Sequence, residues 1–190
     1  GGPSACHSSD DDRSTVSDED QSVLAIPVPQ ADGILSHVRS SFSGEVPPAG
    51  SPAHITLLYP WMPPASIDDN VLAELSSLFA AFPAFDFILK QGWFGREVLL
   101  LVPADARPFV SLTEAIVHRW PEYPYYGGEY DEIEPHISLA YGDEAGLSGL
   151  AAEVTHQLPV QVHAPFVDLS TGEPGHMVTR AKFPLNATSH

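Results

Sequence analysis

The apolar positions of the chain switch repeatedly between the two-residue spacing of a strand and the three-to-four-residue spacing of a helix. Strands are predicted at 23–28, 53–59, 84–90, 97–102, 135–141, 160–169 and 176–184. Helices are predicted at 31–42, 66–82, 107–119 and 143–157, the second with Ser66 as its N-cap. Most of the segments between them contain Pro or Gly, which are typical of turns and loops.

The order strand, helix, strand, helix, strand occurs twice along the chain. The segments 28–32 and 102–105, which precede a helix in each copy, are similar in sequence. This pattern indicates an internal duplication at low identity. Repeated halves often pack about a pseudo-two-fold axis, which would bring equivalent strands together across a central cleft. We therefore expect one α+β domain over residues 22–185, built of two pseudo-symmetric lobes.

Two strands, one in each copy, carry similar motifs. The first reads His54-Ile55-Thr56-Leu57-Leu58-Tyr59, and the second, 82 positions later, reads His136-Ile137-Ser138-Leu139-Ala140-Tyr141. Alternate residues of a strand share one face, so each histidine lies beside the hydroxyl two positions on, opposite an apolar face. One such motif is ordinary, and a pair of half-buried sheet histidines is the simpler interpretation. Two copies favour a functional pair.

Two facing imidazoles suit acid–base chemistry on a phosphodiester. One neutral imidazole takes a proton from the attacking oxygen, and the other, as imidazolium, gives a proton to the leaving oxygen. The hydroxyls of Thr56 and Ser138 would bind the non-bridging phosphate oxygens, where negative charge accumulates. This chemistry requires no metal, so His54, Thr56, His136 and Ser138 are the predicted catalytic residues.

These paired motifs resemble the two-histidine phosphoesterase superfamily, and most closely its 2'-5' RNA ligase-like and cyclic nucleotide phosphodiesterase branches. The resemblance extends to Pro60 and to Tyr126-Gly127-Gly128, and it covers roughly residues 22–185. Ser138 stands where Thr is commoner. Tyr141 stands where some ligase-like members have Arg, which removes a phosphate contact and weakens the case for a long RNA substrate.

The resemblance implies two antiparallel sheets flanked by helices, with the paired motifs lining the groove between them. It also suggests that His136 activates water and that His54 protonates the leaving oxygen, roles that the reverse reaction would exchange.

Several aromatic residues are candidates for contact with a substrate base. Trp61 follows a proline that ends the strand, and it would either lean over the cleft mouth or cover the core. Trp93 falls in the predicted turn 92–95, where it is a candidate to stack on a base, and Tyr126 precedes two glycines in a loop that is a candidate for contact with the substrate. Tyr59 and Tyr141 lie five positions after their histidines, so strict alternation predicts core packing unless a bulge intervenes.

Charge narrows the class of substrate. The 190 residues include 25 Asp and Glu against 8 Lys and Arg, for a net charge of −17. The basic residues are scattered, with Arg96 one isolated candidate for a phosphate contact and a surface charge its simpler interpretation. Nucleic-acid binders use stripes of Lys and Arg. We therefore expect a small nucleotide or a short RNA end as substrate, and no duplex DNA.

Other features indicate what the chain lacks. Its single cysteine, Cys6, provides neither a disulfide framework nor a Cys-based zinc site, and no His-x-x-x-His spacing occurs, so we expect no metal and no cofactor. No stretch reaches 18 consecutive apolar residues, and no signal peptide is visible, so we expect a cytoplasmic monomer without a membrane contact. Residues 1–21 are predicted to be a disordered acidic tail, and 186–190 a C-terminal tail.

The leading functional hypothesis is a metal-independent phosphodiesterase that opens a 2',3'-cyclic phosphate or cleaves a 2'-5' linkage of nucleotides or RNA ends. Reversible 2'-5' RNA ligation uses the same chemistry with a ribose hydroxyl in place of water, and the sequence does not separate the two. A catalytically idle module that binds a nucleotide is the alternative from a different class, and the intact motifs argue against it.

Overall fold

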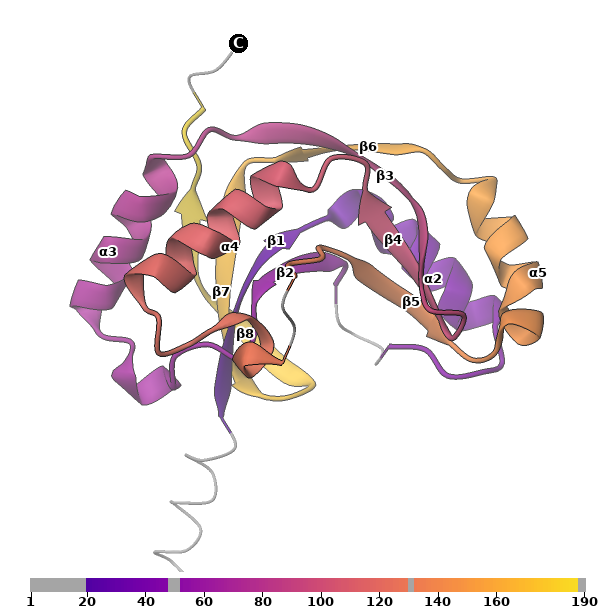
Figure 1. Ribbon diagram of the computed structural model, residues 1–190, viewed down its shortest axis with the longest axis horizontal. Helices are drawn as coiled ribbons and strands as arrows, with labels where there is room; N and C mark the ends of the chain where they lie inside the picture. Colours follow the sequence, from indigo (N-terminus) through magenta and orange to yellow (C-terminus); the bar gives the residue numbers. More distant parts are fainter. Residues whose placement is uncertain (1–19, 48–51, 130–131, 188–190) are drawn as a thin grey trace, which may run out of the picture.

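Two antiparallel sheets form the frame of the molecule in the computed structural model, which describes residues 20–47, 52–129 and 132–187 (Figure 1). The first sheet has the order β2 (His54–Leu58), β1 (Gln21–Pro27), β7 (Phe166–Glu173) and β8 (His176–Pro184). The second has the order β5 (Ile137–Tyr141), β4 (Val98–Pro103), β3 (Phe85–Phe94) and β6 (Val160–Ala164). The predicted two-lobed α+β fold is confirmed. Cys6 and most of the predicted acidic tail lie outside the described residues.

Four α-helices flank the sheets in the described part of the chain: α2 (Asp32–Ser41), α3 (Asp69–Ala80), α4 (Arg107–Arg119) and α5 (Glu144–Thr155). Three match the predicted positions, but α3 begins later than expected. Ser66 ends a short 3-10 turn (Pro64–Ser66), and Asp68 is the N-cap, because its extended backbone lets Oδ1 accept from the Val71 amide at 3.0 Å. The prediction of Ser66 as the cap is therefore wrong.

The two predicted copies are present as β1-α2-β2-α3-β3 and β4-α4-β5-α5-β6, but they exchange elements. Helix α4 connects two strands of the second sheet, yet it contacts β2 of the first. Its Thr113 Oγ1 donates to the Leu57 carbonyl oxygen at 2.8 Å, and both residues are buried. Arg119 of α4 also pairs with Glu74 of α3, at 2.5 Å from Nε to Oε2.

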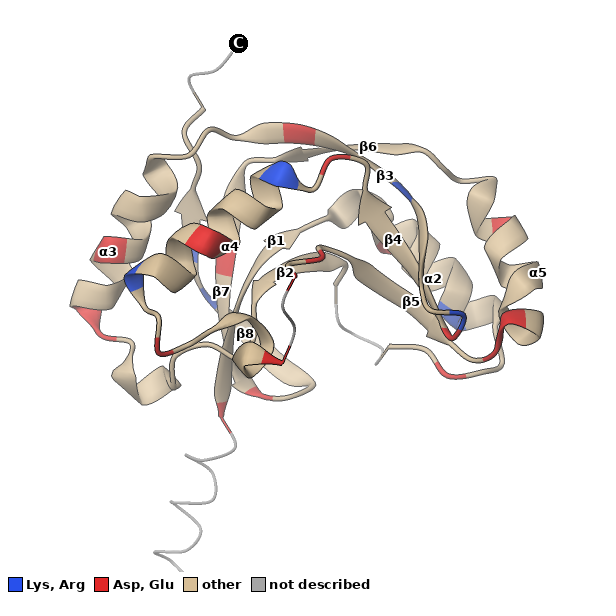
Figure 2. Cartoon of the chain, viewed as in Figure 1, with Lys and Arg blue, Asp and Glu red and all other residues tan. Residues whose placement is uncertain are grey.

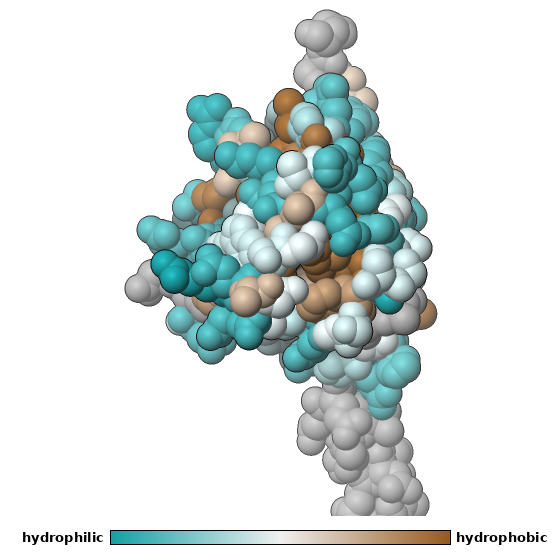
Figure 3. Space-filling model, turned by 90° about the vertical axis from the view of Figure 1, so that its right-hand side faces the viewer, coloured by the Kyte–Doolittle hydropathy of each residue, from teal (hydrophilic) through white to brown (hydrophobic). Residues whose placement is uncertain are grey.

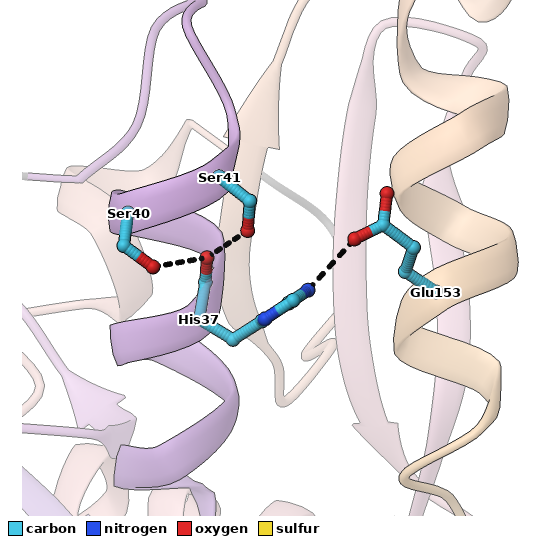
Figure 4. A network of polar contacts seen from close by, with 4 residues as sticks. All are labelled: His37, Ser40, Ser41 and Glu153. Carbon is cyan, nitrogen blue, oxygen red and sulfur yellow. Dashed lines mark hydrogen bonds and ion pairs between the residues drawn. The ribbon is translucent and has the colours of Figure 1, made fainter.

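Helix α2 makes the reciprocal exchange. It connects two strands of the first sheet but contacts β5 of the second. In Figure 4, the His37 imidazole of α2 reaches toward α5, where Nε2 lies 2.8 Å from Oε1 of Glu153. Ser40 and Ser41 donate to the carbonyl oxygen of His37 in the last turn of α2. Each lobe therefore contains one helix from the other copy, as Figure 1 shows, with α3 and α4 on one side and α2 and α5 on the other.

Two predicted strand boundaries are wrong for local reasons. The strand predicted at 160–169 is divided at Pro165, which has no amide hydrogen to donate, so β6 lies in one sheet and β7 in the other. Residues 92–94 of the predicted turn belong instead to β3, in which Gly92 is paired with Leu100, and the turn itself lies at 95–97. A Cβ on Gly92 would approach the Val102 side chain to 3.0 Å, so glycine allows the two strands to pack there.

The core lies between one face of each sheet and the helices. Ile55 and Leu57 on β2, and Val167 and Leu169 on β7, are fully buried, whereas His54, Thr56, Phe166 and Asp168 on the same strands are only partly buried. Phe79 and Phe109 are the largest of the fully buried side chains. The other face of each sheet is therefore available to line a groove. None of the helices within the described ranges is long and apolar enough to span a membrane.

Candidate active site

The two histidine motifs meet where the sheets adjoin. Strands β2 and β5 are edge strands of different sheets, and they contact each other. His54 begins β2 and His136 directly precedes β5. Both histidines, together with Thr56 and Ser138, line one cavity of about 240 Å³, here called the central cavity. The structure thus brings together the four predicted catalytic residues.

Backbone carbonyls hold both imidazoles in the same way. His54 Nδ1 lies 2.8 Å from the carbonyl oxygen of Pro52, and His136 Nδ1 lies 2.8 Å from that of Glu134. Because a carbonyl only accepts hydrogen bonds, Nδ1 carries a proton in each ring. The Nε2 atom of each ring is then the one that takes a proton in the neutral form or gives one in the charged form. The matched pair is suited to move two protons at one phosphorus.

Neighbouring segments fix the approach to each motif. The Asp32 carboxylate, at the start of α2, accepts from the amide of Ala53 at 2.8 Å, one residue before His54. In the second motif, at the C-terminal end of β5, the amide of Tyr141 donates to the carbonyl oxygen of Glu45 at 2.9 Å. The first contact fixes the entry to β2, and the second fixes the exit from β5.

Two further cavities adjoin the central cavity on either side. The aromatic cavity, about 400 Å³, shares Tyr126, His136, Ser138 and Tyr141 with it and extends over the second sheet. The polar cavity, about 390 Å³, shares Pro52, Ala53, His54 and Thr56 with it and extends over the first sheet. The three cavities together form a groove with the two histidines at its centre.

Matching bulges place a tyrosine in each outer cavity. In β2, Thr56 pairs with Ala25 and Leu58 with Leu24, so Leu57 is an extra residue without a partner in the ladder. In β5, Ser138 pairs with Leu100 and Ala140 with Leu99, so Leu139 is the extra residue. Each bulge reverses which face of the sheet the side chains point to, beginning after Thr56 in β2 and after Ser138 in β5. The expectation of core packing for Tyr59 and Tyr141 is therefore wrong, because both line the groove.

Tyr59 is a protonated donor within the polar cavity. Its hydroxyl donates to Oε1 of Gln21, at the start of β1, and its side chain is partly buried. Burial raises the pKa of the Tyr59 hydroxyl, since the phenolate would lose its hydration.

The aromatic residues predicted to bind the substrate divide into two groups. Trp93 and Tyr126 both line the aromatic cavity, although Trp93 and the exposed Phe94 lie on β3 rather than in a turn. Tyr126 has a φ of 47°, uncommon for a residue with a side chain, and its ring packs edge-on against Tyr125 at 4.6 Å between centroids. Trp61 is only 4% exposed, packs against Trp120 at 5.4 Å and lines none of these three cavities.

Arg39 was not among the predicted site residues, yet it lines the central cavity beside Leu35, one turn earlier on α2. Among the described residues that line the three cavities, it is the one Lys or Arg, against the carboxylates Glu132, Glu134 and Asp168. Figure 2 shows how few basic residues the molecule carries. Arg96 is exposed on the β3–β4 hairpin and lines none of these cavities.

The spacing of Leu35 and Arg39 places both on one helix face, a signal present in the sequence. The packing of α2 against β5, which brings Arg39 to the central cavity, could not be predicted from the sequence.

Seen from the side of α2 and α5, the surface is mainly hydrophilic with small hydrophobic areas (Figure 3). Within the described ranges, no group of three or more His, Cys, Asp or Glu side chains lies close enough to hold a metal ion.

Comparison with known proteins gives both a family and a fold. A family model described as the 2'-5' RNA ligase superfamily matches residues 27–169. A search of curated proteins found no match.

Three solved structures illustrate the shared fold. LigT of E. coli complexed with 3'-AMP has 16% identity, a TM-score of 0.58, and coverage of 87% of this chain and 97% of its own. A phosphoesterase has 16% identity, a TM-score of 0.58, and coverage of 88% and 99%. TT0787 of Thermus thermophilus has 18% identity, a TM-score of 0.56, and coverage of 89% and 100%. At these identities the likeness establishes the fold alone.

Proposed function

The chain belongs to the 2'-5' RNA ligase superfamily of two-histidine phosphoesterases, and from this premise we propose that it is a metal-independent phosphodiesterase. Its proposed reaction opens the 2',3'-cyclic phosphate, or cleaves the 2'-5' linkage, of a nucleotide or RNA end. One observation carries the proposal: two imidazoles, each with Nδ1 bonded to a backbone carbonyl, line a single cavity with two hydroxyls.

The chemistry follows from in-line displacement at phosphorus. Water attacks on one side, and the ribose oxygen departs on the other, so a base and an acid are needed on opposite sides. In the proposed assignment, Nε2 of His136 takes the proton of water as the new P–O bond forms. Nε2–H of His54 gives its proton to the ribose oxygen as the old P–O bond breaks. Each lobe contributes one of the two histidines to the cavity, which fits this requirement.

The central cavity also offers groups for the charge on phosphate. The hydroxyls of Thr56 and Ser138 can donate to non-bridging oxygens, and a donor of this kind is worth most where charge develops in the transition state. Arg39 supplies a positive charge and a planar pair of N–H donors suited to two phosphate oxygens. This cation, from another element, would compensate for Tyr141 at the position where some ligase-like members have Arg.

The aromatic cavity supports a nucleotide as the substrate. Trp93, Tyr126 and Tyr141 can provide flat surfaces on which a base stacks. A single Arg among the described lining residues, in a chain of net charge −17, favours a small nucleotide or short RNA end over a long polyanion. With a ribose hydroxyl in place of water, the same arrangement would perform 2'-5' RNA ligation.

The test is turnover of 2',3'-cyclic nucleotides and 2'-5' dinucleotides with and without EDTA. We expect EDTA-resistant hydrolysis by the wild-type protein, lost in His54→Ala and in His136→Ala when both variants remain folded. His118→Ala is the matched control, because His118 is exposed on α4 and lines none of the three cavities. Tight nucleotide binding without turnover would instead indicate a binding module, and joining of a cyclic phosphate end to a 5'-hydroxyl end would indicate a ligase.

A further inference from the structure

The two outer cavities of the groove are similar in volume but different in chemistry. Aromatic rings dominate the cavity beside His136. The polar cavity beside His54 has an apolar part formed by Val23, Ala25 and Met177, and a polar part formed by Asp168, Ser170 and Thr179. At about 390 Å³ it is within the size range of small-molecule sites. The groove therefore has a second compartment, which offers hydrogen-bonding side chains beside an apolar surface.

The polar part comes from two paired strands. Asp168 and Ser170 lie two residues apart on β7, and their neighbours Val167 and Leu169 are buried in the core, so both polar side chains are on the groove face. Thr179 of β8 is directly opposite Ser170. Rigid sheet strands thus carry all three groups, and a ligand would meet them in a fixed arrangement.

Asp168 is the charged group of this compartment. Its side chain is 15% exposed, whereas that of Lys182, whose Nζ lies 3.1 Å from Oδ1 of Asp168, is 57% exposed. Lys182 also packs over the Phe166 ring at 4.3 Å. An ionised carboxylate only accepts hydrogen bonds, and its two oxygens together have about four acceptor positions. One Lys contact leaves most of this capacity for a ligand that brings N–H donors.

We propose that the polar cavity is a nucleobase subsite in which Asp168 selects guanine over uracil. Guanine presents two adjacent donors, N1–H and the N2 amino group, which match the two carboxylate oxygens. Uracil presents one N–H between two carbonyl oxygens, and these oxygens would face the carboxylate unfavourably. The base would lie against Val23, Ala25 and Met177, where a thioether makes favourable contact with an aromatic ring.

This inference rests on the proposed function, because the cavity adjoins His54 and so would hold the nucleoside on one side of the reacting phosphate. The aromatic cavity would hold the nucleoside on the other side, by stacking and with little selection among bases. The preferred substrate is then one with a nucleoside on each side of phosphorus, and guanine at one of the two positions.

The experiment compares kcat/KM for 2'-5' dinucleoside monophosphates that carry guanine or uracil at each position in turn. We expect a guanine preference of about tenfold to a hundredfold at one position, since a bidentate base contact gives discrimination of that order. Asp168→Asn should reduce this preference about tenfold, because a carboxamide has one acceptor and one donor. Part of this reduction should come from faster turnover of the uracil substrates, because Asn no longer presents a negative charge to the uracil oxygens.

Two further variants separate base recognition from a structural ion pair. Lys182→Met removes the pair but keeps the carboxylate, so it should retain the guanine preference. Asp86→Asn is the matched control, since Asp86 forms an exposed cross-strand pair with His163 and lines none of the three cavities. Equal wild-type rates for guanine and uracil at both positions would overturn the proposal, as would an Asp168→Asn variant that keeps the preference.

A binding measurement separates failure of the subsite from failure of the proposed function. Guanosine and uridine 3'-monophosphates are titrated into the wild-type protein and Asp168→Asn by calorimetry. If no dinucleotide is hydrolysed, the phosphodiesterase proposal fails, while tighter binding of the guanosine nucleotide that disappears in Asp168→Asn still supports the subsite. Equal binding of the two nucleotides by the wild-type protein rejects it.

Discussion

Replacement of Thr113 by Val should show how much the bulge in β2 depends on a single side chain of α4. Thr113 is buried, and its Oγ1 donates to the carbonyl oxygen of Leu57 at 2.8 Å. Leu57 is the extra residue of the bulge, and it precedes the reversal that places Tyr59 in the polar cavity. Val has nearly the shape of Thr but no hydroxyl, so this buried acceptor would lose its donor.

The expected loss follows from the burial of both partners. A buried acceptor that loses its donor costs about 1–3 kcal/mol of unfolding free energy. In a protein of this size, each kcal/mol lowers the melting temperature by about 2–4 °C. Thr113→Val should therefore melt about 2–12 °C below the wild type. Thr113→Ser, which keeps the hydroxyl and loses one methyl group, should cost only about 0.8 kcal/mol.

Thermal and urea unfolding of the three proteins measures these differences, and amide hydrogen exchange localises them. In Thr113→Val the amides of residues 56–59 should exchange faster than in Thr113→Ser, because the bulge is less well held. The reasoning is refuted if the Val variant is within about 0.5 kcal/mol of the wild type, or if Ser loses as much stability as Val. Surface substitutions normally stay within that margin.

Four other predictions concern the groove. His54→Ala and His136→Ala should each lower turnover about a hundredfold or more, and the double variant should lose much less than the product, because both act in one transition state. The wild-type rate should fall at both low and high pH, and removal of the base, His136, should abolish the acidic limb. Thr56→Val and Ser138→Ala should each cost about tenfold to a hundredfold, with an unchanged pH profile, since each removes one contact to a charged oxygen. The logarithm of KM for an RNA oligomer should change with the logarithm of salt concentration with a slope of about one, since Arg39 is the one Lys or Arg among the described groove-lining residues.

Three results would contradict these predictions. Near-full activity in a folded variant of either histidine would exclude the two-histidine mechanism. A changed pH profile in the hydroxyl variants would place Thr56 or Ser138 in proton transfer. A salt slope of about five or more would mean that RNA meets basic residues outside the groove.

The local pattern of polar and apolar residues was sufficient to predict the helices, most of the strands and the two histidines at the centre of the site. Helical and strand periodicities depend on neighbouring residues, and they located the four helices and most strands before any tertiary information. The alternation of His54 with Ile55 placed the histidine on one face and the apolar residue in the core, as observed. Two equivalent motifs in a duplicated chain then indicated that His54 and His136 would meet, because repeated units pack symmetrically.

The rest depended on contacts between residues distant in the chain. Two unpaired residues, Leu57 and Leu139, turn Tyr59 and Tyr141 into the groove, and a bulge is set by the register of the partner strand rather than by local propensity. Arg39 reaches the central cavity because α2 packs against the other lobe.

Side-chain burial likewise depended on tertiary packing. Trp61 is buried because Trp120, 59 positions later, packs against it, so its local sequence did not distinguish a cleft residue from a core residue. The sequence by itself therefore determined which residues carry the proposed proton transfer. The tertiary structure alone decided which side chains surround them, since strand register and the choice of packing face are long-range properties.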